Sequence, residues 1–387
     1  MNKLAGAEAI AVLVGTIIGA GVFTLPYVMT NSGVLITIGW LVVVCFLIIF
    51  LHLCFGEIVL RTKKSFCLPG YIGHYLNSPA KKFALLITFL TFGFSLLVCL
   101  QLGAKFVGVI LSTFFSGIVF PEGLIILFLW LCLSAIILSG SKNLSKINFY
   151  LSLILLGLFF LIAMLAQPYF RIENLNFLSF NNQWGWLIPY GVFFFALNGM
   201  VAVPEAIRVV KRKQINKNQV KKILIFGTLI PVFCYLVFMF TVAGVSGINT
   251  SMEAIEGLRN ILREEIILLG AGIGFLAVTT TYLIFGSYIK NSFINDFCWS
   301  SFISHFLVIM GPIVIYFWHL DDLIRLISFL GGMLGGFEGI MILLVLKKAK
   351  EQSELEPPYK MPLNKYLLAV LVVAFIIGAL CQTILVY

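Results

Sequence analysis

A glycine-rich stretch inside a long apolar segment carries the most distinctive chemistry in this sequence. Residues 15–26 read GTIIGAGVFTLP, within an apolar run that extends from about residue 4 to residue 28. Glycine and proline are both unfavourable in a helix interior, so the stretch predicts an interrupted helix. A half-helix that restarts presents free N–H groups and a positive dipole end. We therefore expect the amides of Gly19, Ala20 and Gly21 to bind a carboxylate.

A second interruption has the same spacing from glycine to proline. Residues 199–204 read GMVAVP and correspond to GVFTLP at 21–26, again inside a membrane-length apolar run. The carbonyl end of the half-helix before it, near Phe195 and Ala196, is negative and suits an ammonium group. A zwitterion with one amino-acid backbone between its charges fits such a pair. The alternative is two kinked helices whose glycines pack against neighbours.

Residues beside both interruptions are expected to line the same site. Thr16 and Ile17 flank the first interruption, and Asn198 and Gly199 belong to the second. Asn198 is a polar amide at membrane depth, for which the alternative role is a hydrogen bond between helices. Two interrupted membrane segments in corresponding halves of a chain are typical of the binding site of a secondary transporter.

The composition is that of an integral membrane protein. Of the 387 residues, 61% are apolar and 11% are charged, whereas soluble domains average about 25% charged residues. The eight cysteines and four histidines show no metal-ligand spacing, so no metal centre is predicted beyond a coupling ion. The net charge of +10 comes from basic loops on one side of the membrane. This bias is a topology signal and argues against nucleic-acid binding.

Hydropathy predicts an all-α membrane protein with eleven transmembrane helices. The positive-inside rule places the N-terminus in the cytoplasm and, with an odd number of crossings, the C-terminal Tyr387 outside. The outer segment at 250–265 is amphipathic and is expected to form a short helix, either across the outer mouth or on the surface. The expected crossings are residues 5–30, 33–60, 83–115, 123–140, 147–167, 184–207, 223–247, 266–289, 300–318, 322–346 and 364–387.

Two ionisable residues within the predicted crossings are candidates for proton transfer or gating. Lys105 lies in the outer half of the third crossing, where it can also pair or reach the interface. Glu338, in the tenth crossing, is the most deeply placed carboxylate. It is a candidate proton carrier or a partner for a cation, because ionisable residues inside a membrane are usually functional.

Four motifs stand in a fixed order along the chain: GTIIGAGVFTLPY at 15–27, FFFALNGMVAVPEA at 193–206, GTLIPVFCYLVF at 227–238 and FLAVTTTYLIFGSY at 275–288. Together they resemble the amino acid/polyamine/organocation transporter superfamily, most closely its bacterial aromatic amino acid (tryptophan/tyrosine) permease family. The resemblance implies the leucine-transporter fold, with broken helices 1 and 6 in a single transporter domain. It also implies inverted repeats at about 5–167 and 184–346 and a peripheral helix at about 364–387.

The resemblance implies a place for a coupling ion as well. In sodium-coupled members of this fold, one Na⁺ lies between carbonyls of the first crossing and hydroxyls of the eighth. The matching groups here are the carbonyls of Gly15 and Ile18 and the hydroxyls of Thr280 and Thr281. The aromatic permeases are regarded as proton-coupled, and threonine hydroxyls also bond to their own helix. Sodium and proton coupling therefore both stay open.

The leading hypothesis is secondary, ion-coupled import of amino acids, hydrophobic or aromatic ones in particular, across the cell membrane by alternating access. The sequence resembles no nucleotide-binding loop, and it predicts no enzymatic cofactor and no obligate protein partner. An amino-acid sensor that keeps the site but transports little is an alternative. A polytopic membrane enzyme is a weaker one, because the sequence has no cluster of carboxylates or histidines at a membrane face.

Overall fold

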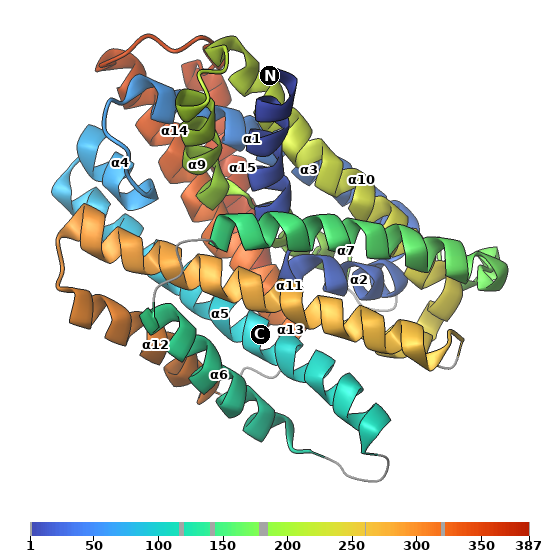
Figure 1. Cartoon of the computed structure of the whole chain (residues 1–387). Helices are drawn as coiled ribbons and strands as arrows, with labels where there is room; N and C mark the ends of the chain where they lie inside the picture. The colour runs from blue at the N-terminus through green and yellow to red at the C-terminus, as the bar shows by residue number, and fades with distance from the viewer. Residues whose placement is uncertain are drawn as a thin grey trace.

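In the computed structural model, every regular element is helical within the residues that it describes, which are 2–115, 120–139, 144–177, 185–259, 261–318 and 322–386. Tyr387 lies outside them. Helices distant in sequence pack together, α5 beside α11 and α1 beside α10 (Figure 1). The helices are α1 (Asn2–Ile17), α2 (Leu25–Ser32), α3 (Val34–Arg61), α4 (Leu68–Tyr75), α5 (Ser78–Phe114), α6 (Glu122–Ser139), α7 (Leu144–Ala166), α8 (Ile188–Leu197), α9 (Val203–Arg212), α10 (Val220–Ser246), α11 (Glu264–Asn291), α12 (Ser301–Tyr316), α13 (Leu323–Phe329), α14 (Gly336–Glu351) and α15 (Lys365–Val386).

Many of these helices are long and apolar enough to cross a bilayer, which needs about 20 apolar residues. Eight pass this test in the described part of the chain, and the bent pair Gly6–Ile17 and Ala20–Ser32 would make a ninth. Leu153–Tyr169 and Ser301–Tyr316 are shorter apolar helices. The chain is therefore a multi-pass membrane protein, and the count of eleven crossings stays a prediction.

The chain leaves helical conformation at Ile18 and Gly19, where the first glycine-rich stretch lies. A 3-10 turn, η1 (Ala20–Thr24), follows and leads into α2. The segments on either side of the interruption are bent by 50°. Pro26 lies in the first turn of α2, where a missing N–H costs no hydrogen bond. Glycine therefore coincides with the end of one segment, and proline with the start of the next.

The second glycine-to-proline stretch has the same local design. The helix α8 ends at Leu197, Asn198 and Gly199 are non-helical, and a 3-10 turn η4 (Met200–Ala202) leads into α9. Pro204 lies in the first turn of α9, as Pro26 does in α2. The matched spacing therefore reflects two helix restarts of the same kind.

The segment before the second interruption is held by close backbone packing. A π-helical turn, η9 (Leu330–Gly335), joins α13 to α14 and packs against α8. A Cβ atom on Gly191 would collide with the backbone of Ser328, and one on Gly331 would collide with the backbone of Gly191. These glycines let α8 and the α13–η9 segment approach more closely than side chains would permit.

The outer segment at 250–265 does not form the expected helix. It contains one short 3-10 turn, η7 (Glu256–Leu258), among turns and bends. Ala254 has φ +67, in the left-handed region that a helix cannot pass through. Ala254, Leu258 and Leu262 are nevertheless buried. These three apolar side chains are therefore buried by an irregular segment and not by a helix.

The last helix, α15, has two different faces. Large apolar side chains such as Tyr366 and Val370 are exposed on one of them. On the other, Gln382 is fully buried and its Nε2 donates to the carbonyl oxygen of Leu187, 3.0 Å away. Ser328 Oγ donates to Gln382 Oε1 at 2.6 Å. One end of α15 is therefore anchored beside the start of α8.

Candidate substrate site between the two helix interruptions

The two interruptions lie against one another. A Cβ atom on Gly21 would lie 2.8 Å from both Cα and Cβ of Ala196. A Cβ atom on Gly199 would lie 2.8 Å from Cγ1 of Ile17. These distances are too short for any side chain larger than hydrogen unless the segments move apart. The structure thus brings together residues 17, 21, 196 and 199, which the sequence assigned to one site.

The restarted segment after the first interruption carries unpaired backbone amides. The N–H groups of Gly19, Ala20 and Gly21 precede the first hydrogen bond within η1, and no acceptor for them is found among the described residues. All three residues are buried. A buried amide without a partner costs about 1–3 kcal/mol. Three consecutive free donors at a helix N-terminus form a site that an anionic group can satisfy.

A tyrosine from an uninterrupted helix joins the two interruptions. Tyr235, on α10, is fully buried. Its hydroxyl lies 2.7 Å from the carbonyl oxygen of Ile17 and 3.0 Å from that of Ala196. Each carbonyl belongs to the last turn of a half-helix, so both are at negative dipole ends. The ends of α1 and α8 therefore share one hydrogen-bond donor.

The restart after the second interruption is capped by protein side chains, unlike the first. Asn198 Oδ1 accepts from the amide of Met200 at 3.1 Å. The amide of Gly199 donates to Nε2 of His52, on α3, at 3.1 Å. These amides are already satisfied, whereas those of residues 19–21 are not. A carboxylate therefore finds three consecutive free donors at the first interruption, whereas the amides of Gly199 and Met200 at the second are already paired.

His52 belongs to a continuous chain of hydrogen bonds. Its side chain is fully buried, and Nδ1 lies 2.8 Å from the hydroxyl of Thr228 on α10. The Thr228 hydroxyl donates to the carbonyl oxygen of Leu224 at 2.9 Å, so it accepts from Nδ1. Because Nε2 accepts from Gly199, the imidazole is neutral with its proton on Nδ1. This fixed tautomer links α3, α10 and the second interruption.

Glu338 contacts the second interruption through Asn198. Asn198 Nδ2 donates to Glu338 Oε2 over a long 3.4 Å, and Oε1 has no hydrogen-bond partner in the described part of the chain. The Thr91 hydroxyl faces Glu338, but this hydroxyl donates its hydrogen bond to the carbonyl oxygen of Ile87, 2.9 Å away. Glu338 is only 3% exposed and forms no ion pair with a described residue. A buried carboxylate with one long hydrogen bond and no paired cation pays a desolvation cost for its charge.

The proposed sodium ligands on α11 lie beside the first interruption. A Cβ atom on Gly19 would lie 2.5 Å from Oγ1 of Thr281. The hydroxyls of Thr280 and Thr281 both donate to the carbonyl oxygen of Ala277, each at 2.9 Å. The lone pairs of the two hydroxyl oxygens can face a cation, but both hydroxyl protons are donated to a carbonyl oxygen of α11 itself. The geometry is compatible with an ion site and does not require one.

Four phenylalanine rings close one side of the first interruption. Phe23 on η1 packs edge-on against Phe106 on α5, with ring centroids 4.9 Å apart. Phe159 on α7 and Phe238 on α10 stack at 4.4 Å and both contact Phe23. All four rings are buried. Because Phe23 follows Gly21 towards α2, the cluster lies on the α2 side of the free amides.

The remaining predicted lining residues differ in what they contact. Phe195 is partly exposed, and its Cδ1 lies 3.3 Å from the Cβ position of Gly21, so its ring borders the free amides. Thr16 Oγ1 donates to the carbonyl oxygen of Val12 in its own helix at 2.9 Å. Phe195 is therefore placed to contact a ligand side chain, and the Thr16 hydroxyl proton is engaged elsewhere.

Lys105 lies near a carboxylate at the rim of the bundle. Its Nζ is 3.9 Å from Oε1 of Glu122, at the start of α6. The Lys105 side chain is 30% exposed and that of Glu122 is 51% exposed. Exposed pairs of this kind contribute about 0–1 kcal/mol. The geometry favours the pairing role among those considered for Lys105.

If the chain takes up amino acids, as the sequence predicts, replacement of Lys105 by methionine should leave that uptake within about twofold of the wild type, because the pair is exposed and weak. Initial uptake rates in proteoliposomes, normalised to reconstituted protein, measure this. Glu122→Gln should behave in the same way. A tenfold loss in Lys105→Met alone would instead assign Lys105 a direct part in gating or coupling.

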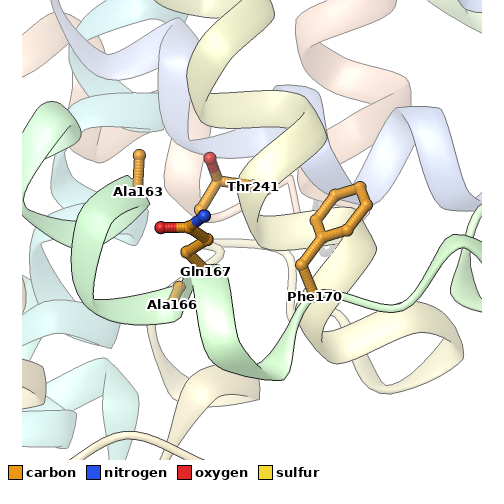
Figure 2. A pocket seen from close by; sticks show the side chains of 5 residues that line it. All are labelled: Ala163, Ala166, Gln167, Phe170 and Thr241. Carbon is orange, nitrogen blue, oxygen red and sulfur yellow. The ribbon is translucent and has the colours of Figure 1, made fainter.

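A pocket lies between the end of α7 and α10. Figure 2 shows that Ala163, Ala166 and Gln167 line it from the end of α7 and the turn that follows, with Phe170 and Thr241 completing it. None of these residues was predicted to contact a ligand, and none contacts the free amides. The pocket has no charged lining group to hold a zwitterion.

Sequence reasoning missed two residues that the structure places at the interruptions. Tyr235 belongs to the motif at 227–238 but received no role there. The sequence analysis treated His52 only as one of four histidines without metal-ligand spacing. The position of His52 in the middle of an apolar crossing could have identified it as a functional residue, because ionisable residues inside a membrane are usually functional.

If the two interruptions bind an amino acid, as the sequence predicts, removal of the His52 side chain should weaken that binding. His52→Ala leaves the Gly199 amide without an acceptor, which costs about 1–3 kcal/mol and should raise the KM for uptake about tenfold. His52→Gln keeps a carbonyl acceptor and should recover most of this loss. Equal KM values for the alanine variant and the wild type would show that the bond to Gly199 does not support the site.

Comparisons with known proteins agree with this architecture. The sequence matches the tryptophan/tyrosine permease family over residues 2–382. Glutamine transporter 2 of Aliivibrio fischeri is 26% identical over 271 residues, which cover 67% of this chain and 64% of that protein. The chain thus spans somewhat less than two thirds of the length of this relative.

Two solved transporters share the fold at low sequence identity. One is the nucleobase-cation-symport-1 transporter Mhp1, in a closed conformation with bromovinylhydantoin bound, at a TM-score of 0.67 and 14% identity over 98% of this chain and 90% of that one. The other is MhsT in complex with L-phenylalanine, at a TM-score of 0.65 and 12% identity over 97% and 98% of the two chains. Both have the leucine-transporter fold. By its match over nearly its full length, this chain belongs to the tryptophan/tyrosine permease family.

Proposed function

We propose that this protein is a secondary active transporter that imports an amino acid together with a coupling ion, by alternating access across the cell membrane. The observation that carries the proposal is the set of three free amides at Gly19, Ala20 and Gly21, which lie against Ala196 of the second interruption. The amides bind the substrate carboxylate. The carbonyl ends near Phe195 and Ala196 bind its ammonium group.

The substrate side chain is proposed to be hydrophobic or aromatic. The Phe195 ring borders the amides, and the cluster around Phe23 lies next to them. No charged side chain is found among the described residues that contact the two interruptions, apart from Glu338 through Asn198. The name of the family points to tryptophan and tyrosine, and that of the A. fischeri relative to glutamine.

The coupling ion is proposed to be a proton carried by Glu338. Its burial, its weak hydrogen bond to Asn198 and the lack of a described cation partner support this assignment. Sodium is the alternative, bound between the carbonyls of Gly15 and Ile18 and the hydroxyls of Thr280 and Thr281. The contact between Gly19 and Thr281 supports it.

The membrane arrangement is part of the same proposal. Residues 2–386 would form eleven crossings, counting the shorter apolar helices, with inverted repeats at about 5–167 and 184–346. The basic loops place the N-terminus in the cytoplasm and the C-terminus outside. The restarts at Pro26 and Pro204 are corresponding features of the two repeats.

Uptake into proteoliposomes tests the proposal. Labelled L-tryptophan, L-tyrosine, L-leucine and L-glutamine are offered under a proton gradient and a sodium gradient imposed separately. Accumulation of at least one amino acid that depends on one gradient is the expected result. Binding without accumulation would favour a sensor. If none of the four amino acids is bound or transported, the proposed function is wrong.

A further inference from the structure

The hydroxyl of Tyr235 occupies a position that the proposed function gives to part of the substrate. It lies between the carbonyl oxygens of Ile17 and Ala196, at 2.7 and 3.0 Å. Its helix, α10, continues without interruption from Val220 to Ser246. The side chain therefore comes from a continuous helix outside both interruptions. It reaches the junction, the place where the carbonyl ends of α1 and α8 meet.

Both carbonyls have lost the donors that a continuous helix would provide. In such a helix, the carbonyl of Ile17 accepts from the amide of Gly21, and that of Ala196 accepts from the amide of Met200. Gly21 has instead turned into η1, and the Met200 amide donates to Asn198 Oδ1. Buried carbonyls need replacement donors, because hydrocarbon and protein interior offer no water.

The single phenolic proton can serve only one of these carbonyls fully at a time. Two acceptors compete for one donor, so the junction can accept another N–H or O–H group. The ammonium group of an amino acid has three N–H donors. It can satisfy both carbonyls and also donate to the phenolic oxygen.

We propose that Tyr235 is a positioning residue that stands in for the substrate ammonium group whenever the site is empty. The inference rests on the proposed function, since it assigns the partner of the ammonium group. Substrate binding displaces the phenolic proton from at least one carbonyl. On substrate release Tyr235 restores the bond, so the two carbonyls of the empty transporter share one donor while it changes conformation.

This role has a specific kinetic consequence. Net uptake requires the empty transporter to return, whereas exchange of one amino acid for another requires only the loaded form to move. Tyr235→Phe removes the stand-in donor and leaves the ring in place. Net uptake should fall about tenfold, the effect of one unpaired buried group. Exchange should stay within about twofold of the wild type, and the KM should fall because substrate meets no competing donor.

The experiment compares both activities in one set of proteoliposomes. The labelled compound is the amino acid, among the four tested, that the wild type transports fastest. It is offered to empty liposomes, which measure net uptake, and to liposomes preloaded with the unlabelled compound, which measure exchange. Tyr282→Phe is the matched control, since the hydroxyl of this buried tyrosine faces Ser134 and forms no described hydrogen bond with either interruption. It should change neither activity.

The outcomes separate this inference from the proposed function. An equal loss of uptake and exchange in Tyr235→Phe, or no loss in either, contradicts the inference while the wild type still transports. If Tyr235→Phe is unstable, saturating amino acid should restore folded protein in a thermal-shift assay. Instability that amino acid does not correct contradicts the inference as well. A wild type that neither binds nor transports refutes the proposed function instead.

Discussion

Replacement of Gly21 by valine is expected to abolish amino-acid binding while the protein still inserts into the membrane. The Cβ atom alone would lie 2.8 Å from Cα and Cβ of Ala196, so the two interruptions must move apart. Overpacking of this kind costs about 1–3 kcal/mol, which corresponds to a loss of affinity of about 5- to 150-fold. The valine side chain also shields the amides from a carboxylate. Binding of labelled amino acid to purified protein measures the effect.

A glycine in open surroundings provides the control for this substitution. Gly272 on α11 has no atom within 4 Å of the position that its Cβ would take. Gly272→Val should therefore bind amino acid as the wild type does, apart from a small cost in helix stability. Gly21→Ala should give an intermediate loss. Wild-type affinity in Gly21→Val would refute the assignment of the carboxylate to these amides.

The sequence locates the two junctions because glycine and proline act through the local backbone. Helix α1 ends at Ile17 and α8 ends at Leu197, within the stretches that the glycines mark. Pro26 and Pro204 then lie in the first turn of the next helix, the position where proline is tolerated. The expectation that the two interruptions form one site rests on the correspondence of residues 21–26 with 199–204, and the structure places Gly21 against Ala196.

The side chains that complete the site could not be derived in the same way. Tyr235 and His52 reach the junctions from α10 and α3, which have no unusual backbone at these positions. Which face of an apolar helix points inward depends on its neighbours, and a uniformly apolar helix carries no periodic signal of that face. A buried tyrosine is identified as functional only when its hydrogen-bond acceptors are known.

The outer segment at 250–265 shows a different limit. Its apolar spacing is helical, and those residues are buried as the spacing predicts. The left-handed backbone at Ala254 nevertheless stops a helix from forming. Helical spacing therefore predicted which side chains are buried but not the backbone that presents them, because tertiary packing overrides weak propensity.

Neutralisation of Glu338 should remove the response of transport to a proton gradient. One pH unit is worth about 1.4 kcal/mol per coupled proton, so it supports about tenfold accumulation of substrate at a one-to-one ratio. Glu338→Gln keeps the shape of the side chain and can still accept from Asn198, but it cannot release a proton. Its accumulation ratio should stay near one under the same gradient. Exchange at equal pH on both sides should persist, since the loaded form still moves.

Thr281→Ala distinguishes the two coupling ions when it is measured beside Glu338→Gln. If Glu338 carries a proton, Thr281→Ala keeps a proton-driven accumulation ratio above one, and a sodium gradient drives neither the variant nor the wild type. If sodium binds between the first interruption and α11, Thr281→Ala loses sodium-driven accumulation while Glu338→Gln keeps it. Both side chains contact an interruption, Thr281 at Gly19 and Glu338 through Asn198. Either ion would therefore act on the substrate through the interrupted backbone that binds the substrate. The contact that carries the coupling is the one whose variant loses accumulation driven by one ion gradient and keeps accumulation driven by the other.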